Sequence, residues 1–524
     1  MVAFVAFEQQ CKHMNKNRTL LNMLMAWLSQ AVTVVAGLIL PRLYLAYFGS
    51  ETNGLIQSIS QFLNYVNLLE GGLGSVFLAS LYKPLAEQDR SALSKRVCAA
   101  QKYFRTIAFI FIAYTIVLSL VYPLIIKSDF EYGFISTLIL ILAIGLFVQF
   151  FFSITYKLLL QADRKVYVVL GTQITTTIFN VLVISLTIKY IRSIHIVRLI
   201  SAAIFIFQPL IFNTYVNKHY KLDKSIEVDA KEELPGRWSS LGQNVAFFIH
   251  NNTDITLLSL ISGLKTVSVY SVHAMVVFGL KNFIMAFSQV FSPKIGLSIA
   301  KDDPKEIERQ IDIYEFVSYF ISTLFFGTCI CLIVPFVQIY TSNISDANYY
   351  QPVFAVILTF SEYVYCIRNP YIAVVYGAGK FKETAVGAYL EAAINILLSI
   401  ALIWRFGLVG IAIGTSIAMT YRWIYHLVYL KNHIIFRSLK KPIKRFIISL
   451  LGIVSSYFLF NRVLFFSLTS VCGWILGAIM CFGIHLFIIL MLDYCFDKDT
   501  FTSLFQMIRH KRRKNLHDSK SVSP

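Results

Sequence analysis

Long apolar runs separated by short polar segments dominate this sequence. We interpret runs of about 20 residues with few charges as membrane-spanning helices, which predicts fourteen spans. The first six fall near residues 20–40, 54–82, 106–126, 134–156, 167–188 and 194–216. After a polar stretch at 217–240, the other eight fall near 241–262, 268–292, 314–337, 351–375, 384–404, 408–430, 446–463 and 469–492. The pattern predicts an all-α integral membrane protein with about 14 transmembrane helices and both ends on one side.

Composition agrees with this prediction. Of the 524 residues, 57% are hydrophobic and only 14% are charged, and the mean hydropathy is +0.65. A soluble domain has about 25% charged residues, and the predicted spans leave no room for a large one. The eight cysteines include no C-x-x-C pair. We therefore predict neither a disulfide framework nor a metal site.

The net charge of +19 is explained mostly by topology. With the N-terminus in the cytoplasm, 36 of the 47 Lys and Arg residues fall in cytoplasmic segments, eight fall outside and three lie within spans. Basic residues in short loops stay on the cytoplasmic side, so both termini are predicted there. The basic tail around Arg509–Lys514 is expected to face anionic lipid rather than nucleic acid.

The sequence also indicates an internal duplication. Gly49, just before the second span, matches Gly263 before the eighth at an offset of 214, and Asn180 matches Asn395 at 215. The turn at 161–165 matches the turn at 377–381. We predict two related six-helix lobes plus two C-terminal helices. The expected divisions are an N-terminal segment (1–18), an N-lobe (19–216), a cytoplasmic linker (217–240), a C-lobe (241–430), the last two spans (431–492) and a basic cytoplasmic tail (493–524).

No catalytic motif is recognisable. The sequence contains no P-loop, no H-E-x-x-H and no G-x-S-x-G elbow. The longest predicted outside loop, about 338–350, is too short for the catalytic loop of a membrane glycosyltransferase or polymerase. We expect a protein without catalytic residues or cofactors, and transport is the function that remains.

Polar residues in the first half follow one stripe of the second span. Gln57, Gln61 and Asn64 share a helical face, and Asn67 and Glu70 continue it before a glycine-rich turn at 71–74. Polar groups inside a span are costly and generally face a cavity or a partner. The stripe therefore predicts a polar cavity lining, with helix–helix contact as the alternative.

Ionisable residues gather in the second half. Asn244, Asn251 and Asp254 share one face of the seventh span, which should face a cavity. Lys281 lies near the middle of the eighth span, too deep to reach water easily. It requires a buried anion partner or an anionic ligand, and the ligand is favoured.

Further charged residues lie in spans ten to twelve: Glu362, Arg368, Glu391, Arg422 and His426. For Arg368, Glu391, Arg422 and His426, which are nearer the cytoplasmic end, a structural ion pair or snorkelling is the favoured interpretation. Together these groups predict a cavity between the lobes that holds an anionic, polar solute. Guanidinium and ammonium groups suit a diphosphate, and amides and aromatic rings suit sugars.

Several motifs resemble those of bacterial polysaccharide flippases of the multidrug/oligosaccharidyl-lipid/polysaccharide exporter superfamily, whose fold is MATE-like. They are Asn17-Arg-Thr-Leu-Leu-Asn, Leu40-Pro-Arg-Leu-Tyr-Leu-Ala-Tyr-Phe-Gly-Ser-Glu-Thr-Asn-Gly-Leu, Leu69-Glu-Gly-Gly-Leu-Gly-Ser and Leu81-Tyr-Lys-Pro-Leu-Ala-Glu. The resemblance covers about residues 17–492. The motifs are mostly Gly, Pro and apolar positions, so they indicate the superfamily better than the substrate.

The resemblance implies a flippase that moves undecaprenyl-diphosphate-linked oligosaccharide repeat units, such as those of O-antigen or capsule, across the cytoplasmic membrane by alternating access. It implies a cationic cavity, for which the candidates are Lys281, Arg368, Arg422 and Arg42. Coupling to H⁺ or Na⁺ is implied as well. The coupling candidates are Glu70, Asp254, Glu362 and Glu391. The implied partners are the lipid-linked oligosaccharide, membrane lipids, a polysaccharide polymerase and other assembly proteins, with no nucleic acid.

Two alternatives stay open. A MATE-like drug or small-solute exporter would need an acidic cavity with few cations, which disagrees with Lys281, Arg368 and Arg422 unless Glu362 or Glu391 neutralises them. A membrane polysaccharide polymerase would need a long outside loop. Within the flippases, a lipid II substrate is disfavoured, because only Arg42 provides a cation near the first two spans.

Overall fold

All the regular secondary structure in the described residues is helical. The computed structural model describes residues 2–70, 73–223, 252–300, 304–435, 437–463 and 468–502, together with positions 226, 228 and 248, and no strand occurs among them. Ten helical stretches within these ranges are long and apolar enough to cross a membrane. The chain forms two compact units, residues 1–269 with 344–347, and residues 270–343 with 348–524. The predicted all-α integral membrane fold is confirmed.

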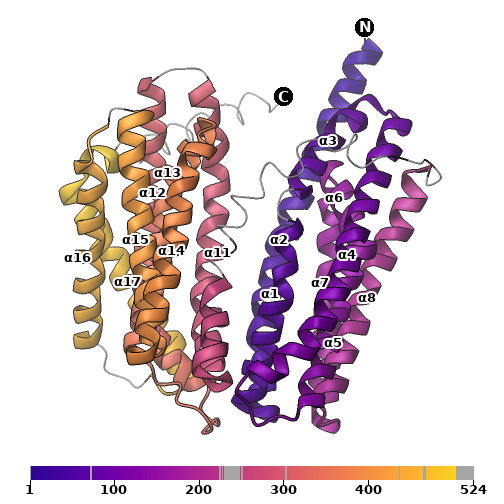
Figure 1. The fold of residues 1–524 in the computed structure, drawn as a ribbon. Helices are drawn as coiled ribbons and strands as arrows, with labels where there is room; N and C mark the ends of the chain where they lie inside the picture. Colours follow the sequence, from indigo (N-terminus) through magenta and orange to yellow (C-terminus); the bar gives the residue numbers. More distant parts are fainter. Residues whose placement is uncertain are drawn as a thin grey trace. The chain divides into compact units, whose positions relative to one another are not determined.

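The first unit contains the helices drawn in indigo to magenta in Figure 1. They are α1 (Val2–Leu63), the 3₁₀ turn η1 (Asn64–Val66), α2 (Asn67–Glu70), α3 (Leu73–Glu87), α4 (Arg90–Ile125), α5 (Tyr132–Val148), the π-helical turn η2 (Gln149–Ser153), α6 (Ile154–Ala162), α7 (Val166–Tyr190), α8 (Ile194–His219) and the π-helical turn η3 (Leu258–Ser262). Most of the predicted seventh span lies outside the described residues.

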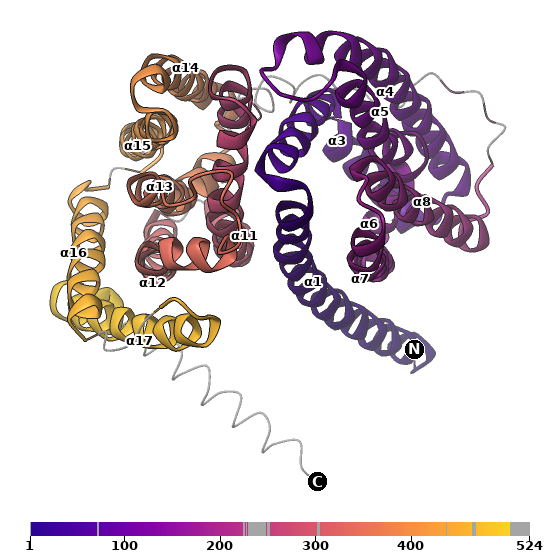
Figure 2. The same ribbon diagram turned by 90° about the horizontal axis from the view of Figure 1, so that it is seen from below.

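The second unit contains the helices drawn in red to yellow, and its first helix begins in the first unit. They are α11 (Leu264–Ala300), α12 (Pro304–Tyr340), α13 (Pro352–Gly377), α14 (Phe381–Phe406), α15 (Leu408–His433), α16 (Lys440–Val463) and α17 (Val471–Phe496). Seen end-on in Figure 2, α13 lies among α11, α12 and α15, and α16 and α17 lie together along one side. The central position of α13 explains why every residue from Ser361 to Arg368 is buried.

Several helices extend beyond the predicted spans. α4 begins at Arg90, well before the apolar run that starts near residue 106. Its first turn is capped by Asp89, whose carboxylate accepts the backbone N–H of Ala92 at 3.0 Å. The predicted span covers only part of this helix, because an apolar run marks the part of a helix in lipid and not the polar turns that project from it.

The polar stripe of the second span coincides with a break in its helix. The helix changes to a 3₁₀ turn at Asn64–Val66, and such a change leaves backbone carbonyls without their usual partners. Two tyrosines of α4 supply donors: Tyr114 Oη bonds the Phe62 carbonyl at 2.8 Å, and Tyr103 Oη bonds that of Leu69 at 3.4 Å. The break is therefore compensated by side chains of the neighbouring helix.

Backbone geometry repeats at the offset seen in the sequence. Gly49 adopts φ 81°, ψ 175° inside α1, and Gly263 adopts φ 88°, ψ 168° before α11. Likewise Arg164, between α6 and α7, and Gly379, between α13 and α14, have φ values of 57° and 68° at an offset of 215. Positive φ is uncommon outside glycine, so this agreement supports a duplicated architecture.

Candidate functional site

Three shielded cations of the second unit, Lys281, Arg368 and Arg422, pair with Glu362 and Glu391 in a network across four helices. Lys281 Nζ of α11 lies 2.9 Å from Glu362 Oε2 of α13. Arg368 Nη1, also of α13, donates to Glu391 Oε1 of α14 at 2.7 Å. Arg422 Nε of α15 lies 3.4 Å from the other oxygen of Glu391. All five side chains are shielded from solvent, since none is more than 13% exposed.

Tyr365 joins the two halves of this network. Its ring centroid lies 4.3 Å from Lys281 Nζ and 4.8 Å from the guanidinium carbon of Arg368. An aromatic face attracts cations at such distances, more strongly where water is excluded. The five charged residues and Tyr365, which we call the α13 network, hold three positive and two negative charges. The α13 network therefore carries one excess positive charge within apolar helices.

A glycine on α14 makes room for the guanidinium of Arg422. A methyl group at Gly387 of α14 would lie 2.3 Å from Arg422 Nη1, so a larger residue would displace the guanidinium. Arg422 Nη1 also donates to the Thr384 carbonyl at 3.1 Å, one turn earlier on α14. His426, one turn after Arg422, is buried and its Nδ1 contacts the Arg422 carbonyl at 2.9 Å. Nδ1 of this imidazole therefore faces the backbone of its own helix.

The structure brings three of the four predicted cations together. Lys281, Arg368 and Arg422 belong to the α13 network, whereas Arg42 is half-buried on α1 in the first unit. Of the two alternatives for Lys281, the structure contains the buried anion partner, Glu362. An anionic ligand would therefore have to replace a carboxylate.

The predicted polar lining of the first unit is partly visible. Gln61 is buried and its amide donates to the Asn252 side chain, while Tyr65 Oη lies 2.7 Å from Thr256 Oγ1. The second-span stripe therefore contacts the end of the seventh span, and helix–helix contact accounts for Gln61. Gln57, Asn64, Asn67 and Glu70 are half-buried and Asp254 is buried, whereas Asn244 and Asn251 lie outside the described residues.

Sequence reasoning missed a second ion cluster in the same unit as the α13 network. Glu315 of α12 is fully buried and accepts hydrogen bonds from Arg437 Nη1 at 2.6 Å and Arg445 Nη1 at 2.8 Å. Asp312 pairs with Arg437, and Asp497, just after α17, pairs with Arg445 at 2.7 Å. These residues lie in or next to three segments that the charge pattern predicts on the cytoplasmic side: the one between spans eight and nine, the one between spans twelve and thirteen, and the C-terminal tail. Their proximity agrees with that shared side. No sequence signal marked the cluster, because its residues belong to segments far apart in the chain: α12, the start of α16 with the residues just before it, and the residue after α17.

Comparison with known proteins identifies the fold. No protein-family profile matches the sequence, and no curated protein matches it. Among solved structures, the inward closed conformation of the lipid II flippase MurJ is 16% identical, covers 92% of this chain and 100% of its own, and gives a TM-score of 0.72.

Two other structures are similar over most of the chain. The MATE multidrug transporter DinF-BH is 15% identical and covers 80% of this chain and 95% of its own, with a TM-score of 0.60. A MOP superfamily transporter from Pyrococcus furiosus is 13% identical and covers 79% and 95%, with a TM-score of 0.53. The chain thus has the fold of these flippase and MATE transporter structures, and the predicted MATE-like fold is confirmed. These three neighbours are transporters or flippases rather than enzymes.

Proposed function

We propose that this protein is a flippase for undecaprenyl-diphosphate-linked oligosaccharide repeat units. It would move them from the inner to the outer leaflet of the bacterial cytoplasmic membrane during assembly of a cell-surface polysaccharide such as O-antigen or capsule. The fold shared with MurJ and MATE transporters supports a transporter that works by alternating access. Both termini would lie in the cytoplasm, where the substrate is made, and a polysaccharide polymerase would act on the product outside.

The observation that carries this proposal is the α13 network. Its net positive charge lies among membrane helices, where an uncompensated ion is costly and generally functional. A diphosphate could take the place of Glu391 between Arg368 and Arg422, because guanidinium groups bind phosphate oxygens in the same paired geometry as carboxylates. Lys281 would add a point charge on the other side of Tyr365.

In the proposed cycle, Glu362 and Glu391 occupy the cationic site while no substrate is bound. Without substrate, Glu362 and Glu391 neutralise two of the three cations, so that the protein does not keep them unpaired in a low-dielectric interior. Protonation of either acid would raise the net charge of the network from +1 to +2 and favour the anion. Glu362 and Glu391 are therefore the coupling candidates with an electrostatic link to the site. Glu70 and Asp254 remain coupling candidates in the first unit.

The first test is a deletion strain that has no redundant flippase. We expect lipid-linked oligosaccharide to accumulate at the cytoplasmic face, measured by extraction and by resistance to an externally added sugar-binding probe. Expression of the wild-type chain should release the intermediate to the outer leaflet. If nothing accumulates, the flippase proposal is wrong. Drug susceptibility of the same strain then tests the MATE-like exporter.

A single substitution in an ion pair leaves the other charge buried without a partner. The test of the α13 network therefore compares a single variant with a double variant that removes both charges. Lys281→Met leaves Glu362 as a buried unpaired carboxylate and is expected to impair insertion as well as export. The double variant Lys281→Met/Glu362→Gln removes both charges and should restore insertion while export stays low. Arg405→Ala, which changes an exposed cation at the end of α14, is the matched control and should export normally. Full export by the double variant would assign a purely structural role to this pair.

A further inference from the structure

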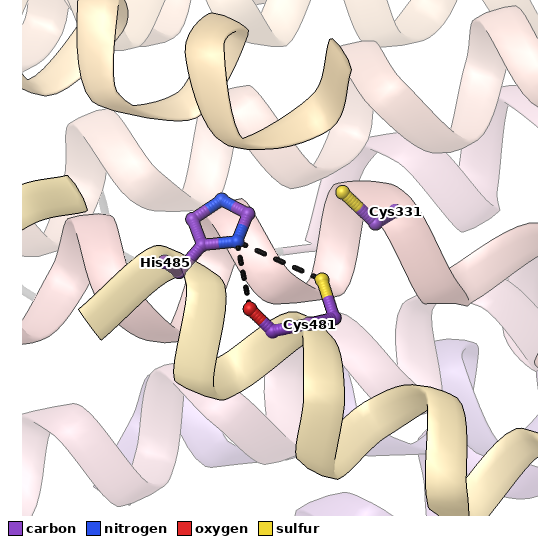
Figure 3. Close-up of side chains that lie close together, drawn as sticks. All are labelled: Cys331, Cys481 and His485. Atoms are coloured by element: carbon purple, nitrogen blue, oxygen red, sulfur yellow. Dashed lines mark hydrogen bonds between the residues drawn. The ribbon is translucent and has the colours of Figure 1, made fainter. Parts of the chain in front are cut away.

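Two cysteines and a histidine lie together between α12 and α17, outside the α13 network. Cys331 belongs to α12, and Cys481 and His485 belong to α17 (Figure 3). One ligand atom from each residue lies within 4.8 Å of the others. Cys481 and His485 are fully buried, whereas Cys331 is half-buried. Sequence spacing gave no metal motif because the ligands are 150 residues apart on two helices.

The surrounding residues hold these side chains in place. Cys481 and His485 are separated by one helical turn, so both point from the same face of α17. A methyl group at Gly327 of α12 would lie 2.6 Å from His485 Nε2, so this glycine makes room for the imidazole. Trp474 Nε1 of α17 donates to the Leu332 carbonyl of α12 at 3.1 Å and fixes the two helices next to Cys331.

The separation of Cys481 and His485 suits a shared metal ion. Cys481 Sγ and His485 Nδ1 are 3.6 Å apart. With a metal–sulfur bond of about 2.3 Å and a metal–nitrogen bond of about 2.05 Å, this separation gives a sulfur–metal–nitrogen angle of about 110°. That is the angle of tetrahedral coordination. Cys331 would approach from the facing helix as the third ligand.

The two thiols, the imidazole and their apolar surroundings favour zinc over other metal ions. Thiolates and imidazole favour zinc or copper(I) and disfavour sodium, magnesium and calcium, which prefer oxygen. The apolar cluster at this point includes Leu332 and Phe460. Zn²⁺ with two thiolates and a neutral imidazole has no net charge, whereas copper(I) would leave one negative charge, which is costly in such surroundings.

We infer that Cys331, Cys481 and His485 form a zinc site that fastens α17 to α12. Binding releases one proton from each thiol, and the imidazole binds the ion through Nδ1 with its proton on Nε2. Because α17 belongs to the C-terminal helix pair, the ion links this pair to the preceding helices of the unit. The inference is independent of what the protein transports.

The test uses the full-length protein in detergent, treated with a chelator and then titrated with ZnCl₂. We expect one zinc per chain by elemental analysis and a rise in the midpoint of thermal unfolding on zinc addition. Cys331→Ser, Cys481→Ser and His485→Ala should each lose stoichiometric zinc and the thermal shift. Cys472→Ser, which changes an exposed cysteine at the start of α17, is the matched control and should retain both.

A spectroscopic measurement keeps the inference testable if a ligand variant fails to fold. Co²⁺ added to the wild-type protein should give the intense visible bands of tetrahedral cobalt and a thiolate charge-transfer band, and Zn²⁺ should abolish them. Three results would overturn the inference: no stoichiometric zinc in the wild type, zinc binding unchanged in the folded ligand variants, or a Cys331–Cys481 disulfide detected by mass spectrometry in protein purified without reductant.

Discussion

Replacement of Glu315 by glutamine tests whether the missed ion cluster holds the second unit together. Glu315 is completely buried and bridges Arg437 and Arg445, which are also buried. Glutamine keeps the size of the side chain and removes its charge. The substitution therefore leaves the two guanidinium groups close together without the carboxylate that separates them.

The expected loss follows from the bonds that break. Glu315 accepts two charge-assisted hydrogen bonds, at 2.6 and 2.8 Å. Such bonds contribute about 1.5–3 kcal/mol each, which suggests about 3–6 kcal/mol for both. Asp312 and Asp497 continue to pair with the arginines and offset part of this loss. We expect a decrease of about 3 kcal/mol in the free energy of unfolding, at the lower end of the range for breaking a buried ion pair.

The assay is equilibrium unfolding of the purified protein in mixed micelles, followed by tryptophan fluorescence. Glu308→Gln is the matched control, because Glu308 is an exposed acid on the same helix and its loss should change stability by less than about 0.5 kcal/mol. A Glu315→Gln variant as stable as the Glu308→Gln variant would refute the reasoning. It would mean that the remaining acids fully satisfy Arg437 and Arg445.

Three further predictions concern backbone packing and the α13 network. Gly54→Ala should greatly reduce the amount of folded protein in the membrane, because the added Cβ would lie 1.8 Å from the Leu264 carbonyl oxygen. Gly37→Ala on the same helix is the control and should be tolerated, because a Cβ there meets open space. Size-exclusion profiles of the two purified variants make the comparison. Asp346→Ala should lower the unfolding free energy by about 1 kcal/mol, because this carboxylate accepts the backbone N–H of Ser50 at 2.7 Å where α1 resumes after its kink, and normal stability would contradict this capping role. Exchanging the charges of Lys281 and Glu362 should retain insertion but lower export, as scored in the deletion strain, and export equal to the wild type would show that the position of the positive charge is unimportant.

Much of the fold could be predicted from the sequence, because a membrane restricts the hydropathy and the length of each segment that crosses it. Each span requires an apolar run of defined length. The predicted runs other than the seventh, most of which lies outside the described residues, correspond to described helices. Gly49 and Gly263, which were matched in the sequence, share a positive-φ backbone conformation that favours glycine. The repeated turn was harder to recognise because Arg164 occupies the position that corresponds to Gly379.

The candidate site was predicted only in its parts. The charge of Lys281, Arg368 and Arg422 marked them as exceptional within spans, yet nothing in the order of residues assigned Glu362 to Lys281 or Glu391 to both arginines. Tyr365 was not anticipated at all, because a tyrosine in an apolar helix carries no distinguishing signal until cations are found on its ring.

The sequence by itself determined the membrane-spanning helices, their expected sidedness and the duplication, because these depend on local hydropathy, on loop charge and on spacing along the chain. Only the tertiary structure decided which charges neutralise one another, where Glu315 lies and which thiols meet His485. Those contacts join helices that are far apart in sequence. In a low-dielectric interior an ion requires a partner, but the partner's identity depends on how the helices pack.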